Sequence, residues 1–317
     1  MQNKTKLAAL IALSLGAVGS VHANTITLGL DSSTNSSAGS DSDSDSDSSA
    51  VSVNSFSSAN DNGNFASGSA RGNDAGWFYT TASASGISAS HVSSVTQSYS
   101  VTNEGDDSFF DFDFNVMNGS ISVFCDDGYG DGYGDGNDRP DFDFPIATAT
   151  SNVLAVDPQP VNCSSRLNAA SLYEANITLD GNVVWSSEAS LTIDNNELSF
   201  DESGTQSLGT YNGGGFFGWG SQSFNIDLGL IAAGQTFDLI YSVTATSTMS
   251  LDDPLVFFND AFIVDGRTQF GDPNGFNQFS ANIFTATPAN VVNTPGTIAL
   301  FGLALVGAAG MSRRKVK

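Results

Sequence analysis

The chain has 317 residues and a net charge of −24, because 34 acidic residues outnumber 10 lysines and arginines. Six of those basic residues lie in the first 23 or last 27 positions, so the part between them holds four arginines, no lysine and a charge of about −30. A field of this sign repels nucleic acid, anionic polysaccharide and anionic lipid, unless divalent cations bridge them to the chain. The 23 phenylalanines exclude a wholly disordered chain, and the length suits one large domain or two small ones.

The N-terminus has the pattern of a secretory signal peptide. Lys4 and Lys6 precede a short apolar run over 7–18, and Val21-His22-Ala23 has the small-x-small form of a cleavage site. We therefore expect residues 1–23 to be removed between Ala23 and Asn24, and the rest of the chain to be exported. The alternative is a retained N-terminal membrane anchor, for which the apolar run is short.

Residues 24–62 are predicted to form a strand followed by an acidic linker. Ile26, Leu28 and Leu30 alternate with other residues, which is typical of a short strand. Between 31 and 49 the sequence is low in complexity, with Asp and Ser alternating from Asp41 to Ser48. This alternation cannot bury an apolar face, so we expect a solvated linker or long loop. It would act as a spacer or hold Ca²⁺ diffusely through its carboxylates.

From Val51 onward the sequence shows the period-two alternation of β-strands, with turn signals such as Asp180-Gly181 and Ala233-Gly234, and residues 63–290 are predicted to form the β-domain. Strands are predicted at 76–81, 91–101, 110–116, 121–125, 172–179, 182–186, 223–228, 235–246, 255–264 and 279–285. The apolar faces of the two clearest are Phe110, Phe112, Phe114 and Val116, and Phe237, Leu239, Tyr241 and Val243. Many short strands without a helical period predict an all-β fold, an antiparallel β-sandwich that is jelly-roll-like.

Carboxylates separated by glycines follow the predicted strand at 121–125. Glycine permits tight backbone turns, and Ca²⁺ takes about six to eight oxygen ligands. The candidate ligands are Asp131, Asp135, Asn137 and Asp138. The spacing is not that of an EF-hand. The alternative is an exposed Gly-Tyr-Asp hairpin that binds no metal.

Two cysteines, Cys125 and Cys163, lie in the part that is expected to be exported. An oxidising compartment favours a disulfide between them. It would close a loop of about 39 residues and stabilise the fold by roughly 4 kcal/mol in the chain-entropy model. A reactive thiol is the alternative.

Catalytic signals are weak. His91 is the one histidine outside the signal peptide, and we expect it to face outward or to pack at a strand end. The sequence has no G-x-S-x-G elbow, phosphate-binding loop, zinc signature or dinucleotide fingerprint. A non-enzymatic protein without a nucleic-acid partner is therefore predicted, and a secreted hydrolase is the less favoured alternative.

The C-terminus, residues 291–317, combines an apolar run over 297–311 with a basic tail over 313–317. At about 1.5 Å per residue this helix would be roughly 23 Å long, shorter than the ~30 Å hydrocarbon core. Arg313, Arg314 and Lys315 would hold the end of the chain on the cytoplasmic side. A short transmembrane helix, held in the membrane until it is cut, is predicted; a lasting tail anchor is the alternative.

This segment resembles the PEP-CTERM sorting signal of Gram-negative bacteria. The resemblance rests on Asn293, Thr294, Pro295 and Gly296, the Leu-rich helix and the arginine cluster, with Asn-Thr-Pro in place of Pro-Glu-Pro. It implies an exosortase, a membrane transpeptidase, as the processing partner. It also implies transient insertion in the inner membrane, then release to the cell surface or extracellular matrix.

The resemblance thus implies a non-enzymatic surface or biofilm-matrix protein. The runner-up is a Ca²⁺-dependent carbohydrate-binding module, in which Trp77, Trp185, Trp219, Tyr129 or Tyr133 could stack on sugars. Tryptophan in a sandwich more often belongs to the core. Extracellular polysaccharide, bridged by divalent cations, would be the partner.

Overall fold

The computed structural model describes residues 25–36, 39–49, 52–61, 64–73, 78–86, 88–126, 167–194, 197–211, 213–251, 263–271 and 283–289. Within these ranges all regular secondary structure is β-strand, and every paired strand runs antiparallel to its neighbour. The all-β, antiparallel prediction is confirmed for this part of the chain.

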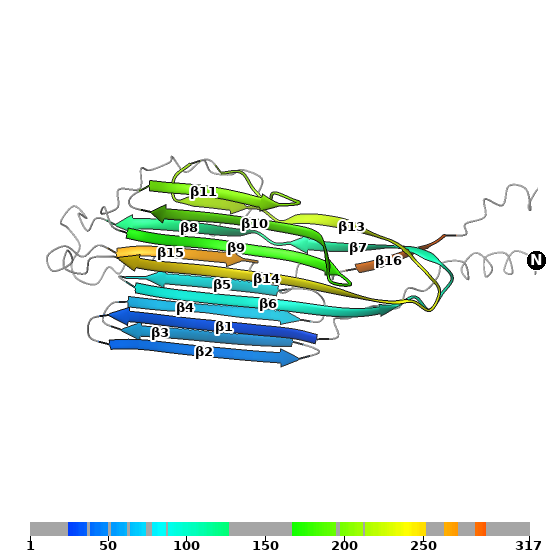
Figure 1. Ribbon diagram of the computed structural model, residues 1–317, viewed down its shortest axis with the longest axis horizontal. Coiled ribbons are helices and arrows are strands. Elements are labelled where there is room, and N and C mark those ends of the chain that lie inside the picture. The colour runs from blue at the N-terminus through cyan, green and yellow to red at the C-terminus, as the bar shows by residue number, and fades with distance from the viewer. Residues whose placement is uncertain are drawn as a thin grey trace, which may run out of the picture.

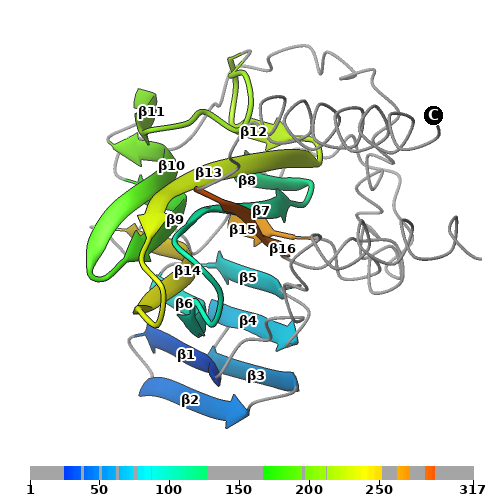
Figure 2. The same ribbon diagram turned by 90° about the vertical axis from the view of Figure 1, so that its right-hand side faces the viewer.

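The strands form two layers (Figures 1 and 2). One layer is a seven-stranded sheet, here called sheet A. Its strands are, in spatial order, β11 (Glu197–Gly204), β10 (Asn182–Asp194), β9 (Leu167–Leu179), β14 (Thr236–Leu251), β6 (Ser88–Thr102), β1 (Thr25–Ser36) and β2 (Gly39–Ser49).

Two smaller sheets make up the facing layer. Sheet B contains β12 (Phe216–Trp219), β8 (Gly119–Asp126), β15 (Ile263–Phe270), β5 (Phe78–Ser85), β4 (Asn64–Asn73) and β3 (Ser52–Asp61). Sheet C contains β13 (Gln222–Ile231), β7 (Ser108–Val116) and β16 (Ile283–Pro288).

Sheets B and C follow one another along a single long ribbon. The β7–β13 pairing ends at Val116↔Gln222, and the β8–β12 pairing begins at Gly119↔Trp219. The indole Nε1 of Trp219 donates a hydrogen bond of 2.9 Å to the backbone oxygen of Met117 at this break. The two smaller sheets therefore cover one face of the long strands of sheet A.

An aromatic core fills the space between sheets A and C. Phe112 lies 4.8 Å from Phe284, and Phe114 lies 5.1 Å from Trp185, measured between ring centroids. Both predicted apolar faces, on β7 and on β14, are buried. Trp185 and Trp219 are only 5% and 6% exposed, so they serve as core residues and not as sugar platforms.

Towards the end where β6 begins, the space between sheets A and B is lined by small and polar side chains. Ser57, Thr80, His91 and Ser93 are all fully buried there. A Cβ added at Gly68 would lie 2.0 Å from His91 Nε2 and 2.2 Å from the backbone oxygen of Thr81. Only glycine therefore leaves room for the histidine at this point.

The Asp-Ser repeat forms strand β2 and not the solvated linker that the sequence predicted. β2 and β3 are the last strands of sheets A and B and lie along the same side of the sandwich. Asp41 Oδ2 accepts a hydrogen bond of 2.9 Å from the backbone N–H of Asn60, and Asp43 Oδ2 accepts one of 2.9 Å from that of Ser58. The carboxylates thus bond to backbone N–H groups of the facing edge strand, which a hydrophobicity pattern does not reveal.

Asp45 continues this row of contacts. The Ser55 hydroxyl donates a hydrogen bond to the Asp45 carboxylate. This bond lowers the pKa of Asp45, and hydrogen bonds from the backbone N–H groups of Ser46 and Phe56 add to the effect. The sandwich consequently begins at Thr25, whereas the sequence placed its start at residue 63. Strands β3, β4, β11 and β12 are also missing from the predicted strands.

Candidate functional site

Most residues predicted to form sites lie outside the described ranges. These are Ala23, Asn24, Asp131, Asp135, Asn137, Asp138, Cys163, Asn293, Thr294, Pro295, Gly296, Arg313, Arg314 and Lys315. The backbone places Cys125 in β8, opposite Val264 of β15. The predicted disulfide between Cys125 and Cys163 stays a prediction, because Cys163 lies outside the described ranges. The described residues contain no helix that is long and apolar enough to cross a membrane.

The described residues also contain no group of three or more His, Cys, Asp or Glu side chains placed to hold a metal ion. Residues 127–138, here called the Gly-Asp segment, lie outside the described ranges. The Ca²⁺ ligands named above therefore stay a prediction.

His91 is fully buried between the sheets, near the end where β6 begins, so the expectation that it faces outward is wrong. Its Nδ1 lies 2.7 Å from Ser32 Oγ, which in turn lies 2.7 Å from Ser57 Oγ. Its Nε2 is buried and has no hydrogen-bond partner among the described residues. Burial lowers the pKa of His91 to about 4, while the nearby Asp31 opposes that shift. The imidazole is therefore neutral near pH 7.

The Ser-Ser-His chain has the composition of a nucleophile and a base, but it lacks access. Ser32 is 3% exposed, and Ser57 and His91 are 0% exposed. A substrate would have to separate the two sheets to reach it. We interpret this cluster as part of the core, where hydroxyls satisfy one nitrogen of a buried imidazole.

A different polar surface faces outward. On β14, Ser242, Thr244, Thr246 and Thr248 alternate with buried residues, and they pair across the ladder with β6. Their partners on β6 are Thr96, Ser94, Val92 and Ser90. One cross-strand pair, Thr96 and Ser242, has its hydroxyl oxygens 3.3 Å apart. We call the hydroxyl residues of these two rows the hydroxyl face. Exposed carboxylates flank it on both sides: Glu174 of β9 lies opposite Thr244, and Asp31 of β1 lies opposite Val92.

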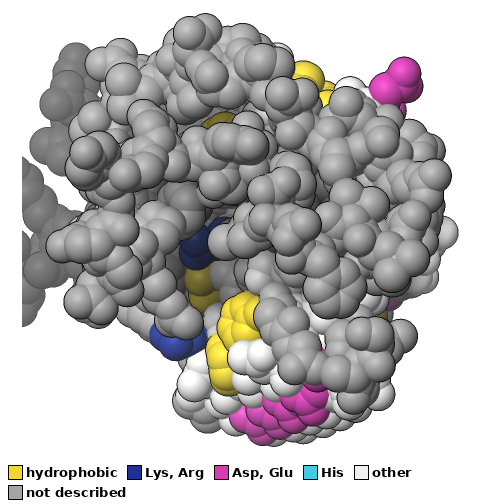
Figure 3. Space-filling view, turned by 90° about the vertical axis from the view of Figure 1, so that its left-hand side faces the viewer, with side chains coloured by type: hydrophobic (Ala, Val, Ile, Leu, Met, Phe, Trp, Pro, Cys, Tyr) yellow, Lys and Arg dark blue, Asp and Glu magenta, His cyan; other side chains and the backbone are white. Residues whose placement is uncertain are grey.

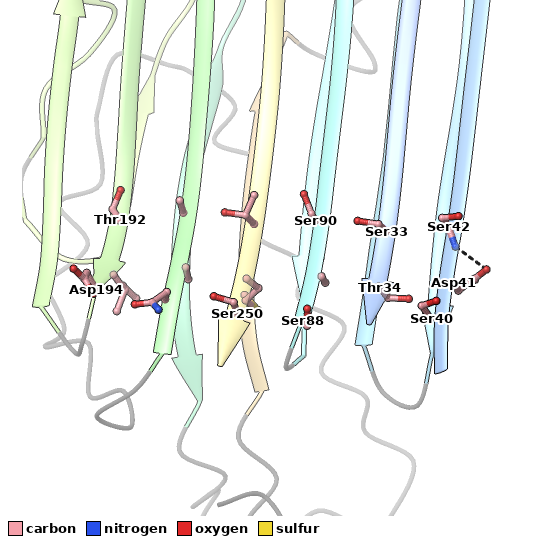
Figure 4. A pocket seen from close by; sticks show the side chains of 17 residues that line it. Ser33, Thr34, Ser40, Asp41, Ser42, Ser88, Ser90, Thr192, Asp194 and Ser250 are labelled. Atoms are coloured by element: carbon pink, nitrogen blue, oxygen red, sulfur yellow. Dashed lines mark hydrogen bonds between the residues drawn. The ribbon is translucent and has the colours of Figure 1, made fainter. Parts of the chain in front are cut away.

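The hydroxyl face leads into a groove at the end of sheet A, where six strands lie side by side (Figure 4). The groove has a volume of about 740 Å³. Strand register sets its central row. Consecutive pairings place Thr192, Ala170, Thr248, Ser90, Ser33 and Ser42 next to one another across β10, β9, β14, β6, β1 and β2. We call this site the end groove.

Thr34 and Asp41 border the end groove, but their side chains lie on the inner face of sheet A, in the same cross-strand row as the buried Ala89. Thr34 is 3% exposed, and its hydroxyl has no hydrogen-bond partner among the described residues. Asp41, at one end, already accepts bonds of 2.9 Å from Ser42 N at Oδ1 and from Asn60 N at Oδ2. Figure 3 shows acidic side chains gathered at one corner of this end of the molecule. The acceptor atoms of Asp41 are thus engaged, whereas the Thr34 hydroxyl is not.

No family model, curated protein or solved structure matches this chain. The class that its own residues define is an antiparallel β-sandwich with a hydroxyl-rich outer face and a polar groove at one end. The sequence carried a signal for that face, because Thr244, Thr246 and Thr248 repeat at period two. It carried none for the groove, whose residues are brought together by register alone.

Proposed function

We propose that this chain is a non-enzymatic exported protein of the cell surface or extracellular matrix, built as a jelly-roll-like β-sandwich. The observation that carries the proposal is the hydroxyl face. It offers a strip of hydroxyl groups two strands wide, which the exposed carboxylates of Glu174 on β9 and Asp31 on β1 flank, on a chain whose net charge is −24. Such a surface suits extended contact with hydrated polymers better than it suits turnover of a small substrate.

The buried histidine supports the same proposal. His91 is the one histidine outside the predicted signal peptide, and it is inaccessible between the sheets. Histidine is the commonest general base, and this one cannot reach a substrate in the folded protein.

The two ends of the sequence support the proposed route. The signal-peptide pattern and the PEP-CTERM-like segment indicate export, an inner-membrane intermediate and processing by an exosortase-like transpeptidase of a Gram-negative bacterium.

Cell fractionation with mass spectrometry of both termini tests this route. We expect the mature protein in the surface or matrix fraction, with Asn24 at its N-terminus and without Arg313, Arg314 and Lys315. A surface form that keeps Lys317 would refute processing, and a wholly cytoplasmic protein would refute export.

The end groove favours carbohydrate binding as a second candidate function. In the Ca²⁺-dependent form of this proposal, Asp131, Asp135, Asn137 and Asp138 hold the ion. Calorimetric titration is the test: heat and a raised melting temperature at millimolar Ca²⁺ would support it, and the absence of both would remove it.

A further inference from the structure

We propose that the outer face of sheet B binds the carboxylate of an acidic sugar polymer, between Arg71 and Arg267. This inference rests on the proposed function only in that the exported protein must meet such polymers. The site is separate from the end groove and from the Gly-Asp segment, and it needs no metal ion.

Strand register places the two arginines on one face of sheet B, on either side of Thr81. Arg71 of β4 lies opposite Tyr79 of β5, which is the outward residue before Thr81. The outward residue after Thr81 is Ser83, and it lies opposite Arg267 of β15. The residues that alternate with them are fully buried on the inner side: Ala70, Thr80, Ala82 and Thr268.

Tyr79 connects the two arginines. Its side chain is only 7% exposed, although it lies on the outer face. Both guanidiniums are close enough to act electrostatically on its hydroxyl, which also hydrogen-bonds to the hydroxyls of Thr81 and Ser69. Burial outweighs these effects and raises the pKa of Tyr79, so the hydroxyl stays protonated. Two cations and three hydroxyl groups therefore converge on one place.

Arg71 lacks an acceptor within this cluster. Its Nε is buried and has no hydrogen-bond partner among the described residues. A buried donor without an acceptor costs folding free energy. Because a guanidinium pairs with a carboxylate through two parallel N–H···O bonds, a bound carboxylate would supply the acceptor that the described residues do not.

The local charge of this face differs from that of the whole chain. The described residues include two arginines and no lysine, and both arginines lie here. Figure 3 shows basic side chains in dark blue beside hydrophobic ones. Asp265 follows Arg267 at the next outward position, on the side away from Tyr79. Since the Debye length is about 8 Å at physiological salt, the distant carboxylates are largely screened and the two guanidiniums dominate at contact.

Groups that suit a sugar ring lie beside the arginines. Phe56 of β3 is 60% exposed, and it lies in the same cross-strand row as Thr81 and Gln269. An exposed aromatic ring can pack on the apolar face of a sugar, while hydroxyl and amide groups bond to its hydroxyls. A uronate unit carries a carboxylate, an apolar ring face and hydroxyls together, so it fits this face better than an inorganic anion does.

Retention of the exported protein on beads tests the proposal, with polygalacturonate on one set of beads and dextran on the other. All buffers contain EDTA, so that divalent cations cannot bridge the protein to the polymer. We expect retention by polygalacturonate at low salt, release at about 1 M NaCl, and no retention by dextran. Arg71→Gln and Arg267→Gln should each weaken binding about tenfold or more.

Ser242→Glu is the charge-matched control, because it lowers the net charge by the same one unit on sheet A. It should bind within about twofold of the unmodified protein. Arg71→Lys keeps the charge but cannot form the planar two-bond pair, so it should also bind more weakly.

Folding is checked on the exposed Arg267. Arg267→Gln should melt like the unmodified protein, so its weaker binding could not be ascribed to unfolding. A galacturonate oligomer should raise the melting temperature of the unmodified protein and leave that of Arg267→Gln unchanged.

No retention by polygalacturonate, equal retention by dextran, undiminished binding by both glutamine variants, or equal loss in Ser242→Glu would overturn the proposal. Self-association in sedimentation velocity that both glutamine variants abolish would overturn it in favour of a second copy of this chain. Localisation is measured separately. A protein found in the matrix fraction that fails on these beads would refute the arginine site and leave the proposed function standing.

Discussion

At the scale of single residues, the polar part of the core is set by one histidine and the glycine beside it. His91 can be buried because Ser32 meets its Nδ1 and because Gly68 leaves space at its Nε2. The absence of a partner at Nε2 means that protonation would place an uncompensated charge between the sheets. Burial thus explains both the low pKa of the imidazole and its cost to the fold in acid.

His91 should make the protein less stable in mild acid. Its pKa is about 4 in the folded state and about 6.5 in an unfolded chain, so below pH 6.5 protons bind preferentially to the unfolded state. Its contribution is complete above pH 6.5 and is lost as the pH falls towards 4. Between pH 7 and pH 5 the loss should be about 2 kcal/mol. Urea denaturation at both pH values should show this difference in the unmodified protein and not in His91→Gln; equal pH dependence in both would contradict it.

Gly68→Ala should be strongly destabilising. The new methyl would overlap His91 and the backbone of β5, so the sheets must separate locally, at a cost of about 3 kcal/mol or more. Gly220→Ala is the control, because its Cβ would meet nothing within 4 Å. Thermal or urea denaturation should give a change below about 0.5 kcal/mol for that control. Similar losses in both variants would show that the close approach at Gly68 is unimportant.

At the scale of elements, the row of aspartates on β2 closes one side of the sandwich. An edge strand exposes free backbone N–H groups that can pair with another chain. Here Asp41 and Asp43 take up such groups on β3, while the N–H groups of Ser46 and Ser48 on β2 bond to the preceding aspartates. The repeat is therefore explained by edge protection, and it needs no bound metal.

Asp43→Ala should loosen this side of the sandwich. Without the carboxylate, the Ser58 amide loses its hydrogen-bond acceptor and should exchange with solvent about fivefold faster, as expected for a bond worth roughly 1 kcal/mol. Asp47→Ala is the matched control, because Asp47 bonds to Ser48 of its own strand. Amide hydrogen exchange measures both variants. Unchanged exchange at Ser58 in Asp43→Ala would contradict the bridging role.

At the scale of the whole molecule, the aromatic half of the sandwich could be predicted from the sequence and the polar half could not. Phe112 and Tyr241 lie on strands whose alternation is apolar, so period and burial agree. The strands that contain Asp43 and Ser57 alternate just as regularly, but a hydrophobicity pattern cannot distinguish a polar strand in a sheet from a solvated linker. The end groove was beyond prediction for another reason: Ser33, Thr192 and Thr248 are adjacent only through strand register.

The excess of negative charge should make stability depend on salt. With 34 acidic residues against 10 basic ones, self-repulsion opposes the compact state. Raising NaCl from about 0.01 M to 1 M shortens the Debye length from roughly 30 Å to 3 Å, so the melting temperature should rise. CaCl₂ at equal ionic strength separates screening from binding. An equal rise of the melting temperature in both salts means that screening alone acts. A larger rise in CaCl₂ indicates the proposed ion site, provided that the double variant Asp131→Asn with Asp135→Asn abolishes the difference. A melting temperature that falls or stays constant in NaCl would show that repulsion does not limit this fold.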